Sequence, residues 1–232
     1  MRYVIGDIHG GCKTFQALLK QINLKYGDIL YLLGDYVDRG PDSKGVLDSI
    51  MALLNDGFDL RPVRGNHDDM MLRTFTGEHD EFSELWLKYW SNVVLKSFGV
   101  DKSQDVPTRY IAFLKGLPFA RYDNQFVFVH AGLDMTKKEP IKQSSSEYML
   151  WSRTDSVDTI KLGNRKIITG HTIHSIEQIK LSLTTNHIHL DNGAFTNQQP
   201  EQGNLLALNL EAMELIIQPW MDGYVGIFSN NQ

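Results

Sequence analysis

The sequence predicts an α/β fold, because its N-terminal third repeats the order of a strand, a polar turn and a helix. Apolar runs at Tyr3–Ile5, Ile29–Leu33 and Phe58–Val63 indicate three strands, and each one ends in glycine and polar residues. Apolar residues at helical spacing follow the first two turns: Phe15, Leu18, Leu19 and Ile22, then Val46, Leu47, Ile50, Leu53 and Leu54. Ligands in α/β folds bind where strand ends meet such turns, so these turns are the place to look for a functional site.

Composition and charge exclude several classes of protein. With 42% hydrophobic and 22% charged residues among 232, the chain is typical of a globular protein of one large domain or two small ones. A formal net charge of −5 leaves no overall positive field to hold nucleic acid or anionic lipid. The sequence shows no signal-peptide pattern and no apolar run of the ~20 residues that span a membrane. Its single cysteine, Cys12, fits a reducing compartment, and we expect it to be buried on a helix. We therefore expect a cytoplasmic protein without nucleic-acid or membrane partners.

The rest of the chain predicts a helical excursion and a second group of strands. Residues 76–106 interrupt the strand–helix order with an aromatic-rich helical face, which we interpret as an excursion over one edge and a candidate lid. Further strands are expected at Phe119–Tyr122 and Gln125–His130, which flank a two-residue turn at Asp123-Asn124, and at Lys166–Thr169, 187–190, 204–210 and 213–218, with a polar stretch at 134–164. No repeat or linker divides the chain, so we predict one catalytic domain over residues 1–232.

Five turns that follow apolar strands share metal-ligating side chains and glycine. They contain Asp7 and His9; Asp35, Asp38 and Arg39; Arg64, Asn66 and His67; His130; and His171. Carboxylate, neutral imidazole and amide oxygen together suit a divalent ion such as Mn²⁺, Fe²⁺ or Zn²⁺. Glycine lets the backbone and a metal approach closely. One such histidine alone would more often be a packing or surface residue, but five turns of one kind indicate a site.

These motifs resemble a known family over about residues 1–195. The matching motifs are Gly6-Asp7-x-His9-Gly10, Gly34 to Gly40, Arg64 to Asp68, His130-Ala131-Gly132 and Gly170-His171. They resemble the phosphoprotein phosphatase group of the calcineurin-like metallophosphoesterases, and most of all the short bacterial and bacteriophage serine/threonine protein phosphatases. The resemblance implies a central β-sandwich flanked by helices in four layers, with a dinuclear metal site at one end of the strands. Asp68 departs from the glutamate common at this position in eukaryotic members.

The resemblance also implies a role for each motif residue. One metal would be held by Asp7, His9 and Asp35, and a second by Asp35 as a bridge together with Asn66, His130 and His171. A hydroxide bound by the two ions, with Mn²⁺ preferred over Fe²⁺ or Zn²⁺, would attack phosphorus directly. His67 would protonate the leaving alkoxide and Asp38 would orient His67. The phosphoryl oxygens would be bound by Arg39, Arg64 and Arg153.

Three functions remain open at this point. The resemblance favours a serine/threonine protein phosphatase acting on phosphorylated proteins or peptides, with phosphotyrosine as a further substrate. A symmetrical dinucleoside tetraphosphatase shares the metal motifs, but commonly differs at the positions of Asp38 and Arg64. A metal-bound scaffold without activity would be expected to have lost His67 or a bridging ligand. We expect Asp191-Asn192-Gly193 to support the site by hydrogen bonding, and His174, His187 and His189 to be structural or exposed.

Overall fold

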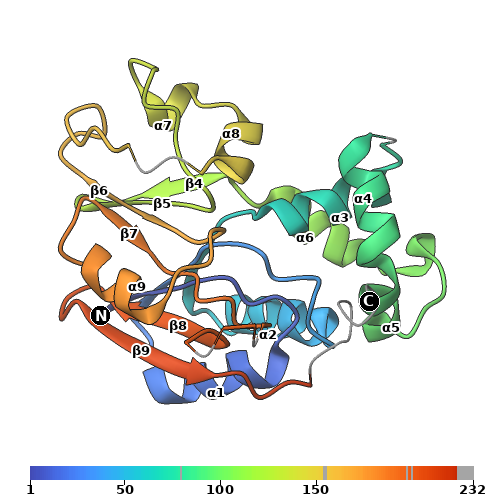
Figure 1. The fold of residues 1–232 in the computed structure, drawn as a ribbon. Coiled ribbons are helices and arrows are strands. Elements are labelled where there is room, and N and C mark those ends of the chain that lie inside the picture. The colour runs from blue at the N-terminus through green and yellow to red at the C-terminus, as the bar shows by residue number, and fades with distance from the viewer. Residues whose placement is uncertain (79, 154–155, 197, 200, 224–232) are drawn as a thin grey trace.

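Two β-sheets packed face to face form the centre of the structure, and helices cover their outer faces (Figure 1). This arrangement confirms the β-sandwich flanked by helices that the sequence motifs imply. The computed structural model describes residues 1–78, 80–153, 156–196, 198–199 and 201–223.

The first sheet has five strands in the order β3-β2-β1-β8-β9. Its strands are β1 (Arg2–Ile5), β2 (Ile29–Leu32), β3 (Asp59–Pro62), β8 (Asn204–Asn209) and β9 (Glu214–Pro219). Strands β1, β2 and β3 run parallel to one another, whereas β8 pairs antiparallel with β1 and with β9. The three predicted N-terminal strands thus lie side by side, with their carboxyl ends at one edge.

The second sheet has four strands in the order β4-β5-β6-β7. Its strands are β4 (Ala120–Tyr122), β5 (Phe126–Val129), β6 (Lys166–Thr169) and β7 (His187–His189). Strands β5, β6 and β7 are parallel, and β4 forms the predicted hairpin with β5. The turn lies one position later than predicted, at Asn124-Gln125, because the Asp123 N–H donates to the Phe126 carbonyl and the Asp123 carboxylate accepts the N–H groups of Gln125 and Phe126.

The strands read as continuous apolar runs because both of their faces are buried. Val4 and Tyr31 point between the two sheets, where the Tyr31 ring stacks on Phe128 at a centroid distance of 3.6 Å. The next residues along the strands, Ile5 and Leu32, face the helices on the outer side of the first sheet. Successive side chains of a strand alternate between faces, so each run fills two cores at once.

Helices from both halves of the chain surround the sheets. The helices are α1 (Cys12–Ile22), α2 (Ser43–Asn55), α3 (Asn66–Thr76), α4 (Glu81–Tyr89), α5 (Ser91–Phe98), the 3₁₀ helix η1 (Ser103–Asp105), α6 (Thr108–Gly116), α7 (Pro140–Gln143), α8 (Ser146–Trp151) and α9 (Ile176–Ser182). The sequence did not predict α7, α8 or α9, because helices of four to seven residues are too short to show a 3.6-residue period. Cys12 is buried at the start of α1. Within the described ranges, no helix is long and apolar enough to cross a membrane.

Candidate active site

All six predicted metal ligands lie at one edge of the sandwich. The turns after β1, β2 and β3 carry Asp7, His9, Asp35 and Asn66, and the turns after β5 and β6 carry His130 and His171. Parallel strands bring their carboxyl ends to a shared edge, and the two sheets face each other, so turns far apart in the chain meet. The backbone N–H of His171 donates to Asp7 Oδ2 at 3.0 Å across 164 residues of sequence.

The backbone at this edge is strained. Five of the predicted site residues have φ in the left-handed region: His9 (47°), Asp35 (52°), Asp38 (71°), Arg39 (65°) and His171 (66°). Each such residue costs about 1–3 kcal/mol unless its surroundings fix it, and strain of this kind concentrates at functional sites. The adjoining Gly34 also has a positive φ, and a Cβ there would lie 2.4 Å from the backbone nitrogen of Gly65. Glycine therefore lets the turns after β2 and β3 touch.

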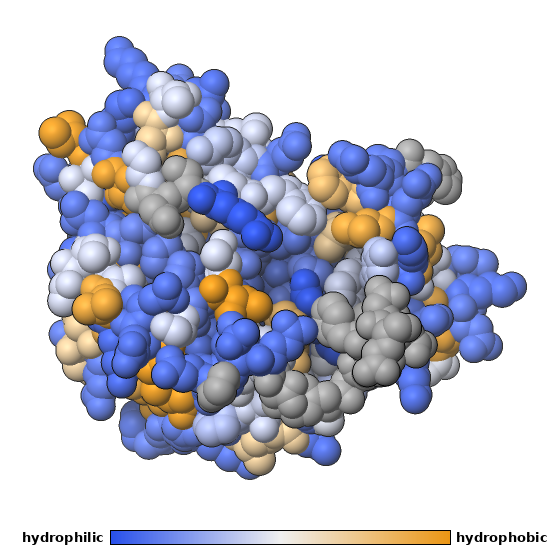
Figure 2. Space-filling model, viewed as in Figure 1, coloured by the Kyte–Doolittle hydropathy of each residue, from blue (hydrophilic) through white to orange (hydrophobic). Residues whose placement is uncertain are grey.

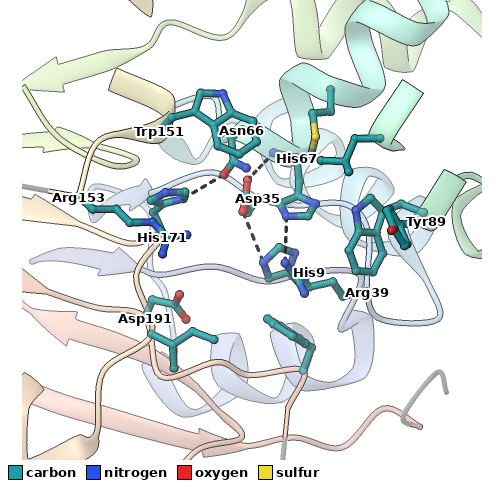
Figure 3. A pocket seen from close by; sticks show the side chains of 15 residues that line it. His9, Asp35, Arg39, Asn66, His67, Tyr89, Trp151, Arg153, His171 and Asp191 are labelled. Carbon is teal, nitrogen blue, oxygen red and sulfur yellow. Dashed lines mark hydrogen bonds and ion pairs between the residues drawn. The ribbon is translucent and has the colours of Figure 1, made fainter. Parts of the chain in front are cut away.

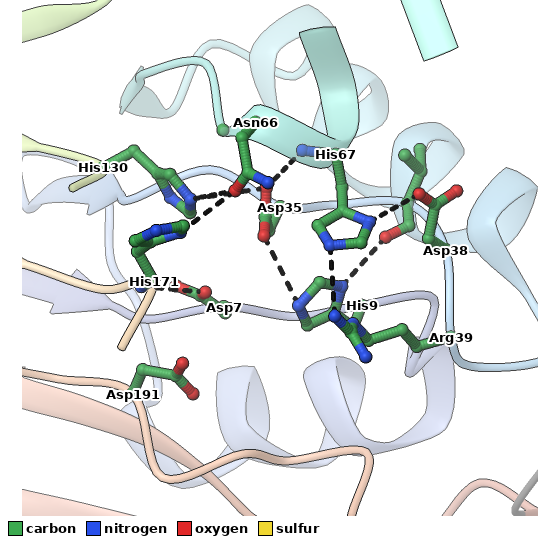
Figure 4. A network of polar contacts seen from close by, with 12 residues as sticks. Asp7, His9, Asp35, Asp38, Arg39, Asn66, His67, His130, His171 and Asp191 are labelled. Carbon is green, nitrogen blue, oxygen red and sulfur yellow. Dashed lines mark hydrogen bonds and ion pairs between the residues drawn. The ribbon is translucent and has the colours of Figure 1, made fainter. Parts of the chain in front are cut away.

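Asp35 lies at the centre of the polar cluster (Figure 4). Its Oδ2 is 3.4 Å from His9 Nε2, and its Oδ1 is 3.5 Å from His130 Nε2. Asp35 belongs to two groups of potential ligand atoms, and within each group the atoms lie within 4.8 Å of one another. One group also contains His9 and His67, and the other also contains Asp7 and His130. A carboxylate shared between two such groups has the geometry to bridge two cations.

The ring orientations leave lone pairs directed at this centre. Nδ1 of His9 lies 3.1 Å from the Val37 carbonyl and Nδ1 of His130 lies 2.9 Å from the Leu33 carbonyl, so each Nδ1 carries the hydrogen and donates it. The unprotonated Nε2 of His130 then faces the amide oxygen of Asn66 at 2.7 Å. Two acceptors at this distance repel each other unless a cation neutralises them.

Two further buried atoms in the cluster have no hydrogen-bond partner within the described part of the chain. They are Oδ1 of Asp7 and Nε2 of His171. Buried polar atoms without partners are costly and rare, and a coordinated cation would satisfy both of these. The donor set of carboxylate, imidazole and amide oxygen thus fits a pair of divalent metal ions.

The charge of the cluster leads to the same conclusion. Among the described residues, five buried carboxylates (Asp7, Asp35, Asp38, Asp68 and Asp191) surround one guanidinium, that of Arg39. Burial, followed by the charges of Asp191 and Asp35, raises the pKa of Asp7 well above its usual range, and burial followed by Asp68 does the same for Asp35. Burial also lowers the pKa values of His9 and His130. If all five carboxyls were ionised the cluster would carry an excess of four negative charges, which two divalent cations would offset.

His67 and Asp38 form a hydrogen-bonded pair beside the cluster. His67 Nδ1 lies 2.6 Å from Asp38 Oδ2, and the other carboxylate oxygen accepts the indole N–H of Trp86 at 2.9 Å. Nε2 of His67 is 3.3 Å from a guanidinium nitrogen of Arg39. Burial and the charge of Arg39 lower the pKa of His67, so the free site holds a neutral imidazole whose Nδ1–H donates to Asp38. This arrangement directs Nε2 toward the pocket.

The pocket above these residues has a polar floor and apolar walls (Figure 3). Its volume is about 200 Å³. The floor and edge contain His9, Asp35, Arg39, Asn66, His67, Arg153, His171 and Asp191; the walls contain Met70, Leu85, Tyr89, Trp90, Trp151, Ile173 and Phe195. Figure 2 shows this face of the molecule, with a hydrophilic hollow near the centre and hydrophobic surface on both sides of it. A small anionic group attached to a less polar body would match this lining.

The three predicted phosphate-binding arginines occupy different positions. Arg39 lines the pocket floor, and the exposed Arg153 lies at its edge. Arg64 does not line the pocket: its Nη1 donates to Asp69 at 2.9 Å and its Nη2 to the Lys115 carbonyl at 2.8 Å. These bonds engage the guanidinium in joining α3 to the end of α6, so the geometry does not support the predicted contact between Arg64 and phosphate.

Asp68 is the main supporting residue that the sequence did not reveal. Its carboxylate accepts the backbone N–H groups of Asp35, Tyr36 and Gly65, each at 2.9 Å. It thereby fixes the backbone of the central Asp35 from the first turn of α3. The available signal was its position three residues after Gly65, which is that of the acidic residue in a helix capping box.

Aromatic residues near the site also escaped prediction. Trp86 and Trp90 belong to the helical face of the predicted excursion, where their spacing indicated packing alone. Phe195 follows the turn at Asp191, whose carboxylate lines the pocket and accepts the Gly193 N–H at 2.7 Å. No sequence pattern distinguishes these rings from ordinary core residues.

Comparison with known proteins identifies the family. The profile of the calcineurin-like phosphoesterases matches residues 2–195, and the chain belongs to this family, for which a dinuclear metal centre is typical. Over 134 residues the chain is 36% identical to a symmetrical bis(5′-nucleosyl)-tetraphosphatase of Enterobacter sp. (strain 638), a match that spans 56% of this chain and only 43% of that protein. It is also 27% identical over 201 residues to serine/threonine-protein phosphatase 2 of Salmonella typhimurium, spanning 83% of this chain and 87% of the relative.

Solved structures share the fold. A putative diadenosine tetraphosphatase aligns with a TM-score of 0.66 and 22% identity, covering 97% of this chain and 94% of its own. A protein serine/threonine phosphatase from Saccharomyces cerevisiae aligns with a TM-score of 0.57 and 18% identity, covering 94% and 78%. At these identities the alignments show the fold and leave the substrate open.

Proposed function

We propose that this protein is a metal-dependent phosphomonoesterase that hydrolyses phosphoserine and phosphothreonine in proteins or peptides. The observation that carries the proposal is the hydrogen-bonded pair of His67 and the buried Asp38 at the pocket floor. A serine or threonine alkoxide is a strong base and leaves only when it receives a proton. Hydrolysis within a polyphosphate releases a phosphate anion, which leaves without one. A site that contains a general acid therefore suits a phosphate monoester better.

In this proposal six residues hold two divalent cations, with Mn²⁺ as the preferred ion. They are Asp7, His9, Asp35, Asn66, His130 and His171, with Asp35 shared. Bound there, the two cations would supply Lewis acidity toward the phosphoryl oxygens and an activated water. Asp68 keeps the backbone of Asp35 in place while this happens.

The remaining residues bind the phosphoryl group and supply the proton. Arg39 on the floor and Arg153 at the edge bind phosphoryl oxygens, and we leave Arg64 out of this role. A bound phosphate dianion offsets the charge of Arg39, which otherwise lowers the pKa of His67. The neutral imidazole then takes up a proton from solvent at Nε2, and Asp38 stabilises the imidazolium. As a water oxygen bonds to phosphorus and the ester P–O bond breaks, this proton passes to the serine oxygen.

The volume of the pocket and the length of the alignment with one relative support the same substrate class. A cavity of about 200 Å³ is smaller than the ~300–1,000 Å³ typical of drug-sized ligands, and it suits one phosphorylated side chain. The similarity to the Salmonella typhimurium phosphatase extends over most of both chains. We also propose that residues 1–232 act as one cytoplasmic catalytic domain, in which the excursion at about 76–106 supplies Trp86 to the site.

A symmetrical dinucleoside tetraphosphatase is the second candidate. It is favoured by the 36% identity to the Enterobacter enzyme, which exceeds the identity to the protein phosphatase although it extends over fewer residues. A catalytically silent scaffold is disfavoured, because the chain keeps the His67–Asp38 pair and a ligand-type residue at each of the six predicted positions.

A substrate panel tests the proposal. The Mn²⁺-supplemented protein is assayed with phosphoserine and phosphothreonine peptides, diadenosine tetraphosphate and p-nitrophenyl phosphate, and the same panel is repeated after chelation. We expect the highest kcat/KM among the natural substrate classes for the phosphopeptides, and loss of all activity on chelation. A higher kcat/KM for the dinucleotide would establish the second candidate instead.

A further inference from the structure

The guanidinium of Arg39 lies between two aromatic rings. Its Cζ is 4.3 Å from the ring centroid of Phe195 and 4.6 Å from that of Trp90. The two rings come from distant parts of the chain, since Trp90 joins α4 to α5 and Phe195 follows the turn after β7. Both distances are well inside the ~6 Å at which a cation is attracted by an aromatic face.

The polar contacts of Arg39 are few. Its Nη2 lies 3.3 Å from His67 Nε2, while its buried Nε has no hydrogen-bond partner within the described residues. Within the same ranges, no carboxylate lies in ion-pair contact with it. The Nε of Arg64 also has no partner among the described residues, but Asp69 and two backbone carbonyls accept hydrogens from its Nη1 and Nη2. Hydrogen bonds thus orient Arg64, and Arg39 needs another restraint.

Aromatic faces can restrain a guanidinium without using its hydrogen-bond donors. A carboxylate partner would neutralise the charge and occupy the N–H groups that bind phosphate, whereas stacking leaves both available in the plane of the group. Each ring also touches a histidine of the site: Phe195 packs edge-on to His9 at 4.8 Å, and Trp90 to His67 at 5.5 Å. Each ring therefore contacts both the arginine and a histidine of the polar cluster.

We infer that Trp90 and Phe195 are positioning residues that clamp Arg39, so that its free N–H groups face the phosphoryl group of the substrate. The inference rests on the proposed phosphatase function and adds residues to which that proposal gave no role. It also gives the helical excursion a second task, because Trp90 ends α4 at the wall of the pocket.

Phosphate binding by the Mn²⁺-loaded protein tests the clamp without any assumption about the substrate. Affinity for inorganic phosphate is measured by calorimetry for Phe195→Leu and Trp90→Leu, which remove a π face and keep apolar volume. We expect each change to weaken phosphate binding ~3- to 30-fold, the range for a largely desolvated cation–π contact. Phe195→Tyr and Trp90→Phe, which keep an aromatic face, should retain most of the affinity. Unchanged affinity in the leucine variants would overturn the inference.

A double-mutant cycle separates the clamp from ordinary packing. In an Arg39→Ala background, Phe195→Leu should change phosphate affinity less than ~2-fold, because the group that the ring positions is gone. An equal loss with and without Arg39 would mean that the ring acts elsewhere. Loss of bound metal in the leucine variants would mean that the rings act through His9, and would also refute the clamp.

The matched control is Tyr122→Leu. Tyr122 stacks under Arg165 at 5.1 Å on the hairpin of the second sheet and does not line the catalytic pocket. Removing this ring breaks a cation–π contact of the same type and should leave phosphate affinity unchanged. Failure of the proposed function would appear as absent phosphopeptide hydrolysis with phosphate binding intact, and so remains distinguishable from failure of the clamp.

Discussion

Replacing Asp38 by asparagine tests the proposed proton donor most directly. Asp38 is fully buried, and its two oxygens accept hydrogens from His67 Nδ1 and Trp86 Nε1. An asparagine has one oxygen for these two donors, so its NH₂ group must face either the indole N–H or His67. In the first case two donors oppose each other, and in the second the neutral tautomer of His67 reverses. Both outcomes remove the negative charge that stabilises the imidazolium.

The expected magnitude follows from the lost bond. A hydrogen bond to a charged group contributes ~1.5–3 kcal/mol, which corresponds to a roughly 10- to 150-fold lower kcat/KM where the imidazolium is required. A phosphoserine peptide requires it, because its leaving group is an alkoxide. p-Nitrophenyl phosphate releases a weakly basic phenolate and should lose less than ~5-fold.

The assay compares these two substrates on the same enzyme preparations. Trp86→Phe is the matched control, because it removes one donor and leaves the carboxylate on His67; its effect should be small and similar for both substrates. The thermal unfolding temperature of Asp38→Asn is measured as well, to check that the variant keeps its fold. Equal losses on the peptide and the aryl phosphate would refute the role of the His67–Asp38 pair as the proton source.

Three further predictions concern metal binding and stability. Asp35→Asn should deplete both metals, and elemental analysis that finds two ions per chain would count against the bridge. Burial raises the pKa of Asp68 to about 7, and the pKa values of Asp7 and Asp35 are also raised, so between pH ~4 and 7 the folded, metal-free protein binds protons that the unfolded chain has released. Denaturation with chelator should therefore show stability falling as the pH rises from ~4.5 through 7, with a smaller fall in Mn²⁺. The Asp222 carboxylate accepts the backbone N–H groups of Lys13 and Thr14 in the first turn of α1, and also the Thr14 hydroxyl. Asp222→Ala should therefore lower the free energy of unfolding by about 1–2 kcal/mol, measured by urea unfolding. A change within error would show that this contact is not stabilising.

Local features of the sequence predicted the fold and the location of the site well. Each motif residue follows an apolar strand directly, so strand prediction alone brought Asp7, Asp35 and Asn66 to one edge, and the structure places His130 and His171 beside them. The family resemblance supplied the sandwich, because strand patterns do not reveal how two sheets face each other.

Long-range contacts account for what the sequence did not predict. Arg64 stands in a phosphatase-like motif, yet its partners include the carbonyls of Lys115 and Leu117, some fifty residues away. Trp86 was interpreted as a packing residue, and it is one, but its indole nitrogen also reaches Asp38. Chain periodicity specifies which face of a helix is buried, and it does not specify the polar atom that the buried face meets.

The arrangement of ligands on two separate sheets has a consequence for how the protein is made. Asn66 belongs to the half of the chain that contains β1 to β3, whereas His130 and His171 follow strands of the other sheet. A cation bound by these three residues would cross-link the two sheets at this edge, in addition to the apolar core between them. During synthesis the metal could not bind fully until His171 had emerged from the ribosome, so the nascent chain would lack a complete metal centre until then.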